Sequence, residues 1–303
     1  MSERRGAPAE SEPGLTIAAL ADELADMLAA RGVGEPRTQA RDIITALAAQ
    51  PRSWAFVRSD AALTGADCDR ARAAAEMLAR GAPFAYAVGR ASFRHLTLEV
   101  DPRVLIPRPE TELLVDVVFD ELGGADAATG VAIDVGTGSG AIALALASEG
   151  RFSRVYATDI SLDALAVARR NVERASASLR APVELRHGSL LAAVRDVGAD
   201  VIASNPPYIA LGEAAELPRS VRDWEPPVAL YGGNDGLVVT ARLVREAADL
   251  LRPDGLLAIE VDARRASLVA ELVARDSRFR AVRVVLDLTG RERFVLARRK
   301  EKA

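Results

Sequence analysis

The stretch Val131-Ala-Ile-Asp-Val-Gly-Thr-Gly-Ser-Gly-Ala-Ile-Ala-Leu144 joins a short apolar run to a helix-forming run through a loop with three glycines. Glycine lets the backbone turn sharply and approach a ligand closely at the start of a helix, where free N–H groups point outward. A strand, a glycine loop and a helix in this order are typical of sheets that bind nucleotide-like cofactors. The stretch therefore predicts the first strand and the first turn of an open α/β sheet.

The spacing of the loop glycines leaves two adenosine-containing cofactors open. Gly136, Gly138 and Ala141 fit the dinucleotide fingerprint, and Asp159 follows at the distance at which a carboxylate binds ribose hydroxyls. Gly140 stands one residue earlier than the third glycine of that fingerprint. This spacing favours S-adenosylmethionine over a dinucleotide.

Apolar stretches of strand length alternate with amphipathic ones from residue 108 to the C-terminus. Strands are expected at 131–135, 154–158, 183–186, 201–204, 256–261, 281–286 and 294–297, and helices at 110–122, 141–148, 162–175, 237–250 and 264–274. This alternation predicts a Rossmann-like, mostly parallel sheet covered on both faces. The last two strands are too close for a crossover helix, so we expect an antiparallel strand at the C-terminal end.

The residues before this sheet predict three further regions. Residues 1–14 are expected to be a disordered tail, 15–83 a small all-helical domain and 84–107 a β-hairpin linker, leaving 108–303 as the cofactor-binding domain. In the linker, strand-like composition at 93–100 and 103–106 flanks Asp101-Pro102, which is a turn signal.

Composition excludes several classes of function. The 303-residue chain has a net charge of -4, whereas proteins that grip nucleic acid through many phosphates usually carry a basic excess. With one cysteine, Cys68, and two histidines, we expect neither a disulfide nor a metal site. No secretory signal and no apolar run of membrane-spanning length occur. We expect a cytoplasmic protein without stable nucleic-acid or membrane binding.

The tetrapeptide Asn205-Pro206-Pro207-Tyr208 follows the fourth expected strand, at the edge of the sheet where the glycine loop lies. The nitrogen of an amide or an aryl amine is a poor nucleophile because its lone pair is delocalised. The side-chain carbonyl of Asn205 and the backbone carbonyl of Pro206 can each accept one N–H of such a group, and Tyr208 offers a flat surface to it. Positioning in line with a sulfonium methyl then supplies most of the rate. The tetrapeptide thus predicts a methyltransferase acting on a planar NH2 group, either an amide or an adenine.

Several other segments allow a structural and a functional interpretation. Residues 108–112 start a helix and could be purely structural. His187 is most simply a loop histidine, and Leu190 stands where the adenine would pack. The segments 224–227 and 232–236 belong to a long loop that is either a lid or an irregular connection.

Taken together, the ordered motifs resemble the HemK/PrmC protein-(glutamine-N5) methyltransferases. The resemblance covers roughly residues 80–298, and it rests on the segments 106–112, 134–140, 159–165, 204–209, 225–237 and 287–293. Two positions depart from the pattern of that family: Leu190 replaces a frequent aromatic residue, and Glu260-Val261-Asp262 replaces Glu-x-Gly.

The resemblance implies methyl transfer from S-adenosylmethionine to the glutamine of the Gly-Gly-Gln motif in class 1 peptide chain release factors. It implies that cofactor is bound by Asp159, Leu190, Asn205 and the loop Gly136, Thr137, Gly138, Ser139 and Gly140. It also implies that Asn205, Pro206, Pro207 and Tyr208 bind the glutamine, with Asn205, Pro206 and Tyr208 catalytic, and that the helical domain recognises the substrate. Three alternatives stay open: a ribosomal-protein glutamine methyltransferase, a DNA adenine-N6 methyltransferase, and an inactive adaptor that only binds the cofactor.

Overall fold

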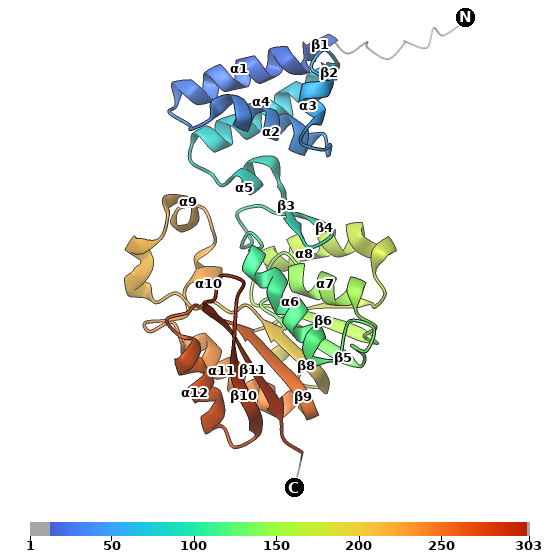
Figure 1. The fold of residues 1–303 in the computed structure, drawn as a ribbon, viewed down its shortest axis with the longest axis vertical. Helices are drawn as coiled ribbons and strands as arrows, with labels where there is room; N and C mark the ends of the chain where they lie inside the picture. Colours follow the sequence, from blue (N-terminus) through green and yellow to red (C-terminus); the bar gives the residue numbers. More distant parts are fainter. Residues whose placement is uncertain (1–12, 302–303) are drawn as a thin grey trace, which may run out of the picture. The chain divides into compact units, whose positions relative to one another are not determined.

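The computed structural model describes residues 13–301 and divides the chain into two compact units, Met1–Gly89 and Arg90–Ala303 (Figure 1). Most of the predicted tail, residues 1–12, lies outside the described residues, whereas Pro13 and Gly14 belong to strand β1 (Pro13–Thr16). The domain limits at 14, 83 and 107 remain a prediction.

The first unit is built mainly from helices. Its elements after β1 are α1 (Ile17–Ala30), α2 (Pro36–Leu47), α3 (Trp54–Val57), β2 (Ala62–Thr64), α4 (Gly65–Ala79) and α5 (Phe84–Val88). The apolar residues Leu20, Leu24 and Leu28 lie one helical turn apart on α1 and are fully buried. Thr16 caps α1, as its position predicts, because its hydroxyl accepts the N–H of Ala19 at 3.2 Å. The three long helices match the prediction, and β1 and β2 add a short antiparallel pair.

The second unit begins with a β-hairpin, but the predicted position of its strands is wrong. The antiparallel strands are β3 (Arg90–Phe93) and β4 (Leu96–Glu99), and the turn lies at Arg94-His95 instead of Asp101-Pro102. The Arg94 side chain contacts Glu149 at 2.6 Å, which holds the turn there. The Asp101 carboxylate accepts the N–H of Arg103 at 3.0 Å, so residues 103–106 begin in a local turn and form no strand.

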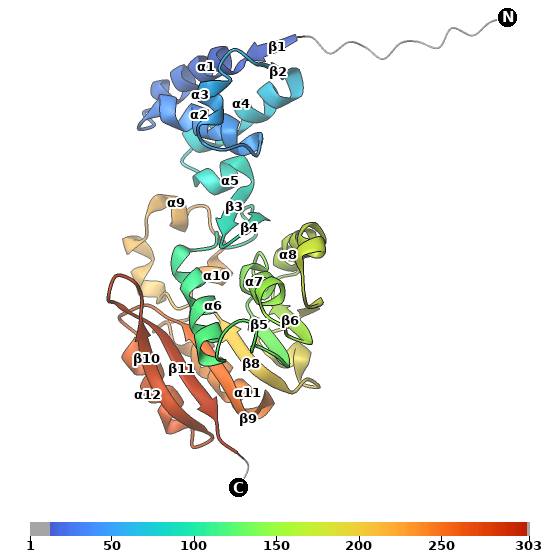
Figure 2. The same ribbon diagram turned by 45° about the vertical axis from the view of Figure 1, so that its right-hand side comes forward.

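The remaining strands form one seven-stranded sheet in the order β10-β11-β9-β8-β5-β6-β7. Their bounds are β5 (Val131–Val135), β6 (Arg154–Asp159), β7 (Val183–His187), β8 (Ala199–Ser204), β9 (Leu251–Glu260), β10 (Phe279–Leu286) and β11 (Glu292–Arg299). Pairing is parallel from β9 to β7, and β11 runs antiparallel to both of its neighbours, β9 and β10 (Figure 2). The predicted mostly parallel sheet with an antiparallel C-terminal strand is confirmed.

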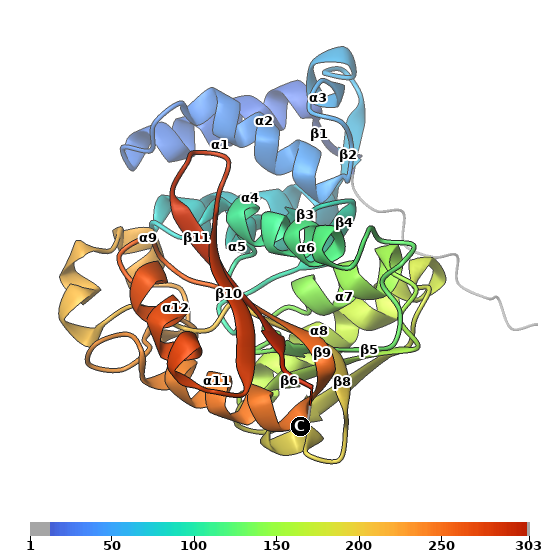
Figure 3. The same ribbon diagram turned by 60° about the horizontal axis from the view of Figure 1, so that its bottom comes forward.

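Helices cover both faces of this sheet (Figure 3). On one face lie α6 (Pro109–Glu121), α7 (Ala141–Glu149) and α8 (Leu162–Ala175), and on the other lie α11 (Val238–Leu250) and α12 (Ala266–Arg275). Successive strand residues point to opposite faces, so Ala132 packs in the first core and Ile133 in the second. Both faces of the sheet are therefore buried. A ligand can reach the sheet at the ends of its strands.

Strand order places the switch point of the sheet between β5 and β8. The chain runs outward from β5 through β6 to β7, then returns to add β8 on the other side of β5. The loops after β5 and β8 leave the sheet in opposite directions, which opens a crevice at their carboxyl ends. Those loops are the glycine loop and the Asn-Pro-Pro-Tyr segment.

Candidate functional site

The glycine loop after β5 is fixed by the neighbouring strand. The N–H groups of Gly136 and Thr137 both donate to the carbonyl of Thr158, each at 2.9 Å. Gly136 and Gly138 have φ angles of 73° and 54°, which residues with a side chain rarely adopt, and a Cβ at either position would point into open space. The loop therefore presents bare backbone to a cavity, which fits a ligand that approaches the backbone closely.

A buried aspartate at the end of β5 ties the loop to the helix that follows. Asp134 is fully buried, and its Oδ2 accepts the hydroxyl of Thr137 at 2.6 Å and the N–H of Ala143 at 3.0 Å. Burial raises the pKa of Asp134 to about 7, and the two hydrogen bonds oppose this shift. Thr137 thus turns its side chain inward and contributes only backbone to the loop surface.

Asp159 closes the other side of the loop from the end of β6. Its Oδ2 accepts the N–H of Gly138 and its Oδ1 accepts the N–H of Ser161, both at 2.9 Å. Burial raises the pKa of Asp159, while these backbone N–H groups act in the opposite direction. A carboxylate held in this way beside the cavity has lone pairs left for ribose hydroxyls.

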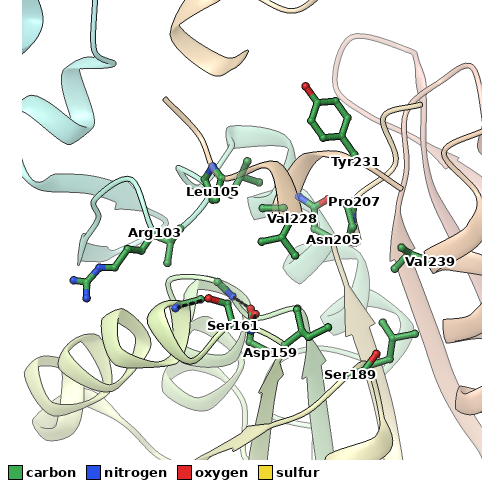
Figure 4. A pocket seen from close by; sticks show the side chains of 18 of the residues that line it. Arg103, Leu105, Asp159, Ser161, Ser189, Asn205, Pro207, Val228, Tyr231 and Val239 are labelled. Atoms are coloured by element: carbon green, nitrogen blue, oxygen red, sulfur yellow. Dashed lines mark hydrogen bonds between the residues drawn. The ribbon is translucent and has the colours of Figure 1, made fainter. Parts of the chain in front are cut away.

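A first cavity of about 320 Å³ lies along the glycine loop. Of the residues predicted to bind cofactor, Gly136, Gly138, Asp159, Leu190 and Asn205 line it; Thr137, Ser139 and Gly140 do not. Figure 4 shows Asp159 and Ser161 on one side of the cavity, and Asn205 and Pro207 on the opposite side. Its size and its mostly apolar lining with a few polar groups suit a nucleoside-sized ligand.

The cavity also has lining residues that were not predicted to bind the cofactor. They come from residues 103–105 and from the segment 226–242, and they include Arg103, Val104, Leu105, Pro226, Val228, Ala229, Tyr231, Val238, Val239 and Arg242. Leu190 adopts a φ of 53°, unusual for a residue with a side chain, at the point where the adenine was expected. The sequence did not identify these contacts, because they depend on the paths of the chain before α6 and after β8.

The Asn-Pro-Pro-Tyr segment separates the first cavity from a second one of about 280 Å³. Pro207 lines the first cavity, Pro206 and Tyr208 line the second, and Asn205 lines both. The side-chain amide of Asn205 therefore lies where the two cavities meet. This is the position required of a group that touches both a methyl donor and an acceptor.

The glycine-rich segment 232–236 supports the tetrapeptide from behind. Ile209 donates to the carbonyl of Leu230 at 3.0 Å, and Gly232 donates to the carbonyl of Ile209 at 2.9 Å. A Cβ on Gly232 would lie 2.4 Å from the carbonyl oxygen of Pro207, and one on Gly236 would lie 2.1 Å from that of Tyr208. These glycines are needed because two backbone segments run in direct contact.

The segment at the start of α6 is tied to the loop after β8 by a partly buried ion pair. Arg108, which lines the second cavity, donates to Oε1 of Glu225, and the N–H of Ile106 donates to Oε2 of the same carboxylate at 3.3 Å. The side chain of Glu225 is almost fully buried. Residues 106–112 therefore form part of the wall of the site.

Asn205 is itself held by α6 and β9. Its Nδ2 lies 3.1 Å from the hydroxyl oxygen of Thr111, and that hydroxyl lies close enough to the carboxyl of Glu260 to lower its pKa. Thr111 and Glu260 are buried, and burial raises the pKa of Glu260 to about 7. Burial, followed by the charge of Glu260, raises the pKa of Tyr208 to about 12, so its phenol stays neutral. Neither Thr111 nor Glu260 was predicted as a site residue.

Asp262, where the family pattern has glycine, belongs to a cluster behind the site. Its Oδ2 pairs with Nη1 of Arg265 at 2.7 Å, and Nη2 of Arg265 binds Glu213 at 2.8 Å. The Nε of Arg265 donates to the carbonyl of Asp235 at 2.9 Å. This departure from the family pattern therefore links β9, the segment η3 (Leu211–Glu216) and the loop 232–236.

Comparison with known proteins gives matches for both units. A family model described as PrmC N-terminal domain matches residues 19–89, and one described as Methyltransferase small domain matches residues 109–217. No helix among residues 13–301 has the length and apolar character needed to cross a bilayer.

The chain is similar along nearly its whole length to bacterial relatives. It is 39% identical to the release factor glutamine methyltransferase of Moorella thermoacetica, covering 95% of this chain and 100% of the relative. It is 37% identical to that of Streptomyces coelicolor, covering 90% and 94%. Among solved structures, a methyltransferase from Pyrococcus furiosus superposes with a TM-score of 0.51 at 24% identity, covering 70% of this chain and 92% of the other.

The last similarity shows the fold alone, whereas the relatives and the geometry of the glycine loop decide the family. The resemblance inferred from the ordered motifs is thereby confirmed, together with S-adenosylmethionine as the cofactor. The chain belongs to the release factor glutamine methyltransferase family and is an S-adenosylmethionine-dependent enzyme.

Proposed function

We propose that this enzyme methylates the side-chain amide nitrogen, N5, of the glutamine in the Gly-Gly-Gln motif of class 1 peptide chain release factors. The relatives in the same family are named for methylation of release factor glutamine. The observation that carries the proposal is the place of Asn205, whose side chain borders both cavities of the site.

On the cofactor side, each predicted residue receives a role that its geometry allows. Gly136 and Gly138 offer bare backbone along the first cavity, Asp159 accepts hydrogen bonds from the ribose hydroxyls, and Leu190 packs against the adenine. Thr137, Ser139 and Gly140 act indirectly, by holding the loop in shape. When bound, S-adenosylmethionine supplies a sulfonium methyl group, which is a strong electrophile.

On the amide side, two acceptors hold the nitrogen. The Oδ1 of Asn205 accepts one N–H and the backbone carbonyl of Pro206 accepts the other, while Tyr208 and Pro207 flank the planar group. The two acceptors fix the direction of the nitrogen lone pair, and positioning of this kind is the main source of rate in a transfer that needs little acid–base help. No step requires a charged nucleophile from the protein.

The lining of the second cavity favours a neutral acceptor with an aliphatic stem. Most of its lining is apolar, and it comprises Leu105, Ile209, Leu217, Val221, Ala229 and Leu230 beside the tetrapeptide. Its one charged residue, Arg108, is paired with Glu225, and the Tyr208 phenol is neutral because its pKa is raised to about 12. A glutamine side chain has this character, since two methylenes carry an uncharged amide.

We assign recognition of the release factor to the helical region 15–83, part of which matches the PrmC N-terminal domain. Release factors act in the cytoplasm, so this assignment also places the enzyme there.

Label transfer from S-adenosylmethionine tests the proposal. The protein is incubated with radiolabelled cofactor and one of four acceptors: a class 1 release factor, the same factor with its Gly-Gly-Gln glutamine changed to alanine, ribosomal protein, or duplex DNA. We expect label on the first acceptor alone. Label on DNA would identify an adenine methyltransferase, label on a ribosomal protein the sister activity, and no label on any acceptor an adaptor.

A further inference from the structure

Three polar groups from distant parts of the second unit, two of them buried, lie in a row beside the reacting groups. Asn205 follows β8, Thr111 lies in the first turn of α6, and Glu260 ends β9. The amide Nδ2 of Asn205 donates to the hydroxyl oxygen of Thr111 at 3.1 Å, and the same hydroxyl faces the carboxyl of Glu260, whose pKa it lowers. Thr111 is 5% exposed and Glu260 is 1% exposed, so water has little access to the hydroxyl and the carboxyl.

The chemistry of the three groups determines which of them donates and which accepts each hydrogen bond. A carboxylate only accepts hydrogen bonds, and a hydroxyl has one proton to donate. Once Thr111 donates that proton to Glu260, its oxygen can only accept from Asn205. The NH2 end of the Asn205 amide must then face Thr111, and its Oδ1 must face away. The two ends of an amide are nearly the same in shape, so packing alone does not set this choice.

We infer that Thr111 is a positioning residue for methyl transfer, and that with Glu260 it fixes which end of the Asn205 amide meets the substrate. The inference rests on the proposed function, in which Oδ1 of Asn205 accepts an N–H of the substrate amide. If the Asn205 amide turned over, its NH2 group would face the NH2 group of the substrate. Two donors cannot bond to each other, so that arrangement would be unproductive.

Charged groups on neighbouring elements act on the carboxylate of Glu260. Arg293 on β11 and Arg108 before α6 favour its charge, while Glu110 opposes it. Arg293 is in turn fixed by Asp287 at 3.3 Å and by the carbonyl of Val261 at 3.4 Å. The second oxygen of Glu260, Oε2, is buried and has no hydrogen-bond partner among the described residues.

This environment makes the orientation of the Asn205 amide depend on pH. Tyr208 also lies near Glu260, because the charges of Glu260 and Asp262 both raise the pKa of its phenol. Burial raises the pKa of Glu260 to about 7. A protonated Glu260 can donate as well as accept, so it no longer forces Thr111 to donate, and the Asn205 amide is free to turn over. The fixed orientation is therefore present above this pKa and is lost below it.

Substitution of Thr111 separates a positioning role from a structural one. Thr111→Ser and Thr111→Ala both lack the methyl group and differ only in the hydroxyl. We expect the serine variant to stay within about threefold of wild-type kcat, and the alanine and valine variants to lose about 10- to 100-fold, the usual effect of one lost positioning hydrogen bond. The dissociation constant for S-adenosylmethionine and the KM for the release factor should stay within about threefold.

Thr240→Val is the matched control for the loss of a buried hydroxyl. Thr240 lies on α11, is fully buried and has no hydrogen-bond partner for its hydroxyl among the described residues, so valine should leave kcat unchanged. Thermal unfolding of every variant shows which have folded, and the serine and alanine pair decides the question if the valine variant has not. Equal kcat in the serine and alanine variants would overturn the inference. Wild-type protein that labels no release factor would instead overturn the proposed function.

Discussion

The glycine loop and the Asn-Pro-Pro-Tyr segment lie at neighbouring strand ends, but they are held by different kinds of contact. The loop is supported by residues close in sequence: the hydrogen bond from Gly138 to Asp159 joins positions 21 residues apart. The amide of Asn205 is supported across 94 residues by Thr111, and the wall beside it across 117 residues by the pair of Arg108 and Glu225. Contacts close in sequence shape the glycine loop, whereas contacts distant in sequence hold Asn205 and the wall beside it.

The difference implies that the two sides can be damaged separately. Substitutions around Asn205 should act on the transfer step, and those around Asp159 on cofactor affinity. The four predictions below probe this separation, beginning with the largest expected effect.

Asn205→Ala should reduce kcat by at least about 1,000-fold, because it removes the acceptor that holds the nitrogen. Cofactor should still bind, since Gly136, Gly138 and Asp159 are unaffected. Equilibrium binding of S-adenosylmethionine and single-turnover transfer to a release factor measure the two effects. An alanine variant that retains transfer would remove Asn205 from the catalytic role proposed here.

Gly236→Ala should destabilise the protein by about 2–4 kcal/mol and impair transfer, because the new Cβ would meet the carbonyl oxygen of Tyr208 at 2.1 Å. Gly290→Ala is the matched control. Gly290 has a φ of 78°, close to the 77° of Gly236, but its Cβ would meet nothing within 4 Å. Chemical denaturation of both variants separates the effect of backbone strain from that of the clash. An equal decrease in the free energy of unfolding of the two variants would show that the contact with Tyr208 is unimportant.

Asp159→Asn should weaken S-adenosylmethionine binding by about 10- to 100-fold, because the variant loses a charged acceptor for ribose hydroxyls. At saturating cofactor, kcat should return to near the wild-type value. Isothermal titration and kinetics over a range of cofactor concentrations test this. A lowered kcat that saturation does not restore would contradict the separation of the two sides.

Glu260→Gln should change the pH dependence of kcat by a few-fold. Wild-type kcat, measured at saturating cofactor, should fall as the pH drops below the pKa of Glu260 at about 7. Glutamine can both donate and accept hydrogen bonds, as protonated glutamate can. The variant should therefore show the lower kcat at every pH. Asp134 also has a pKa near 7, but it lies under the glycine loop and is common to both proteins. Parallel pH profiles would contradict the role of Glu260.

Much of the fold could be predicted because its pattern is local. The strand 131–135 and the helix 162–175 have the predicted bounds, since a run of buried residues or an amphipathic period defines each of them. The hairpin was misplaced because Phe93–Val100 reads as one continuous strand. Its turn depends on Arg94, whose partner Glu149 lies 55 residues away. The short helices α3 and α5 were missed, because four or five residues show no period.

The residues of the candidate site also divide into those that local sequence patterns predict and those that depend on distant contacts. The glycines, Asp159 and the tetrapeptide could be recognised from spacing, because the chemistry requires those residue types in that order. Thr111 and Glu260 could not be assigned to Asn205, since a helix start and a strand end become neighbours only when the sheet has formed. The contacts among Asp262, Arg265 and Glu213 likewise could not be predicted, because Glu213 lies far from the other two in sequence.

Fragmentation mass spectrometry of a release factor methylated by this enzyme tests most directly the proposal that Asn205 presents an amide nitrogen to the methyl donor. The position of the methyl group can be assigned to one residue and to one atom within it. We expect a single methyl on the side-chain amide nitrogen of the Gly-Gly-Gln glutamine, absent when Asn205→Ala replaces the wild type. A methyl on any other residue, or on a nucleic-acid base in place of the protein, would contradict it.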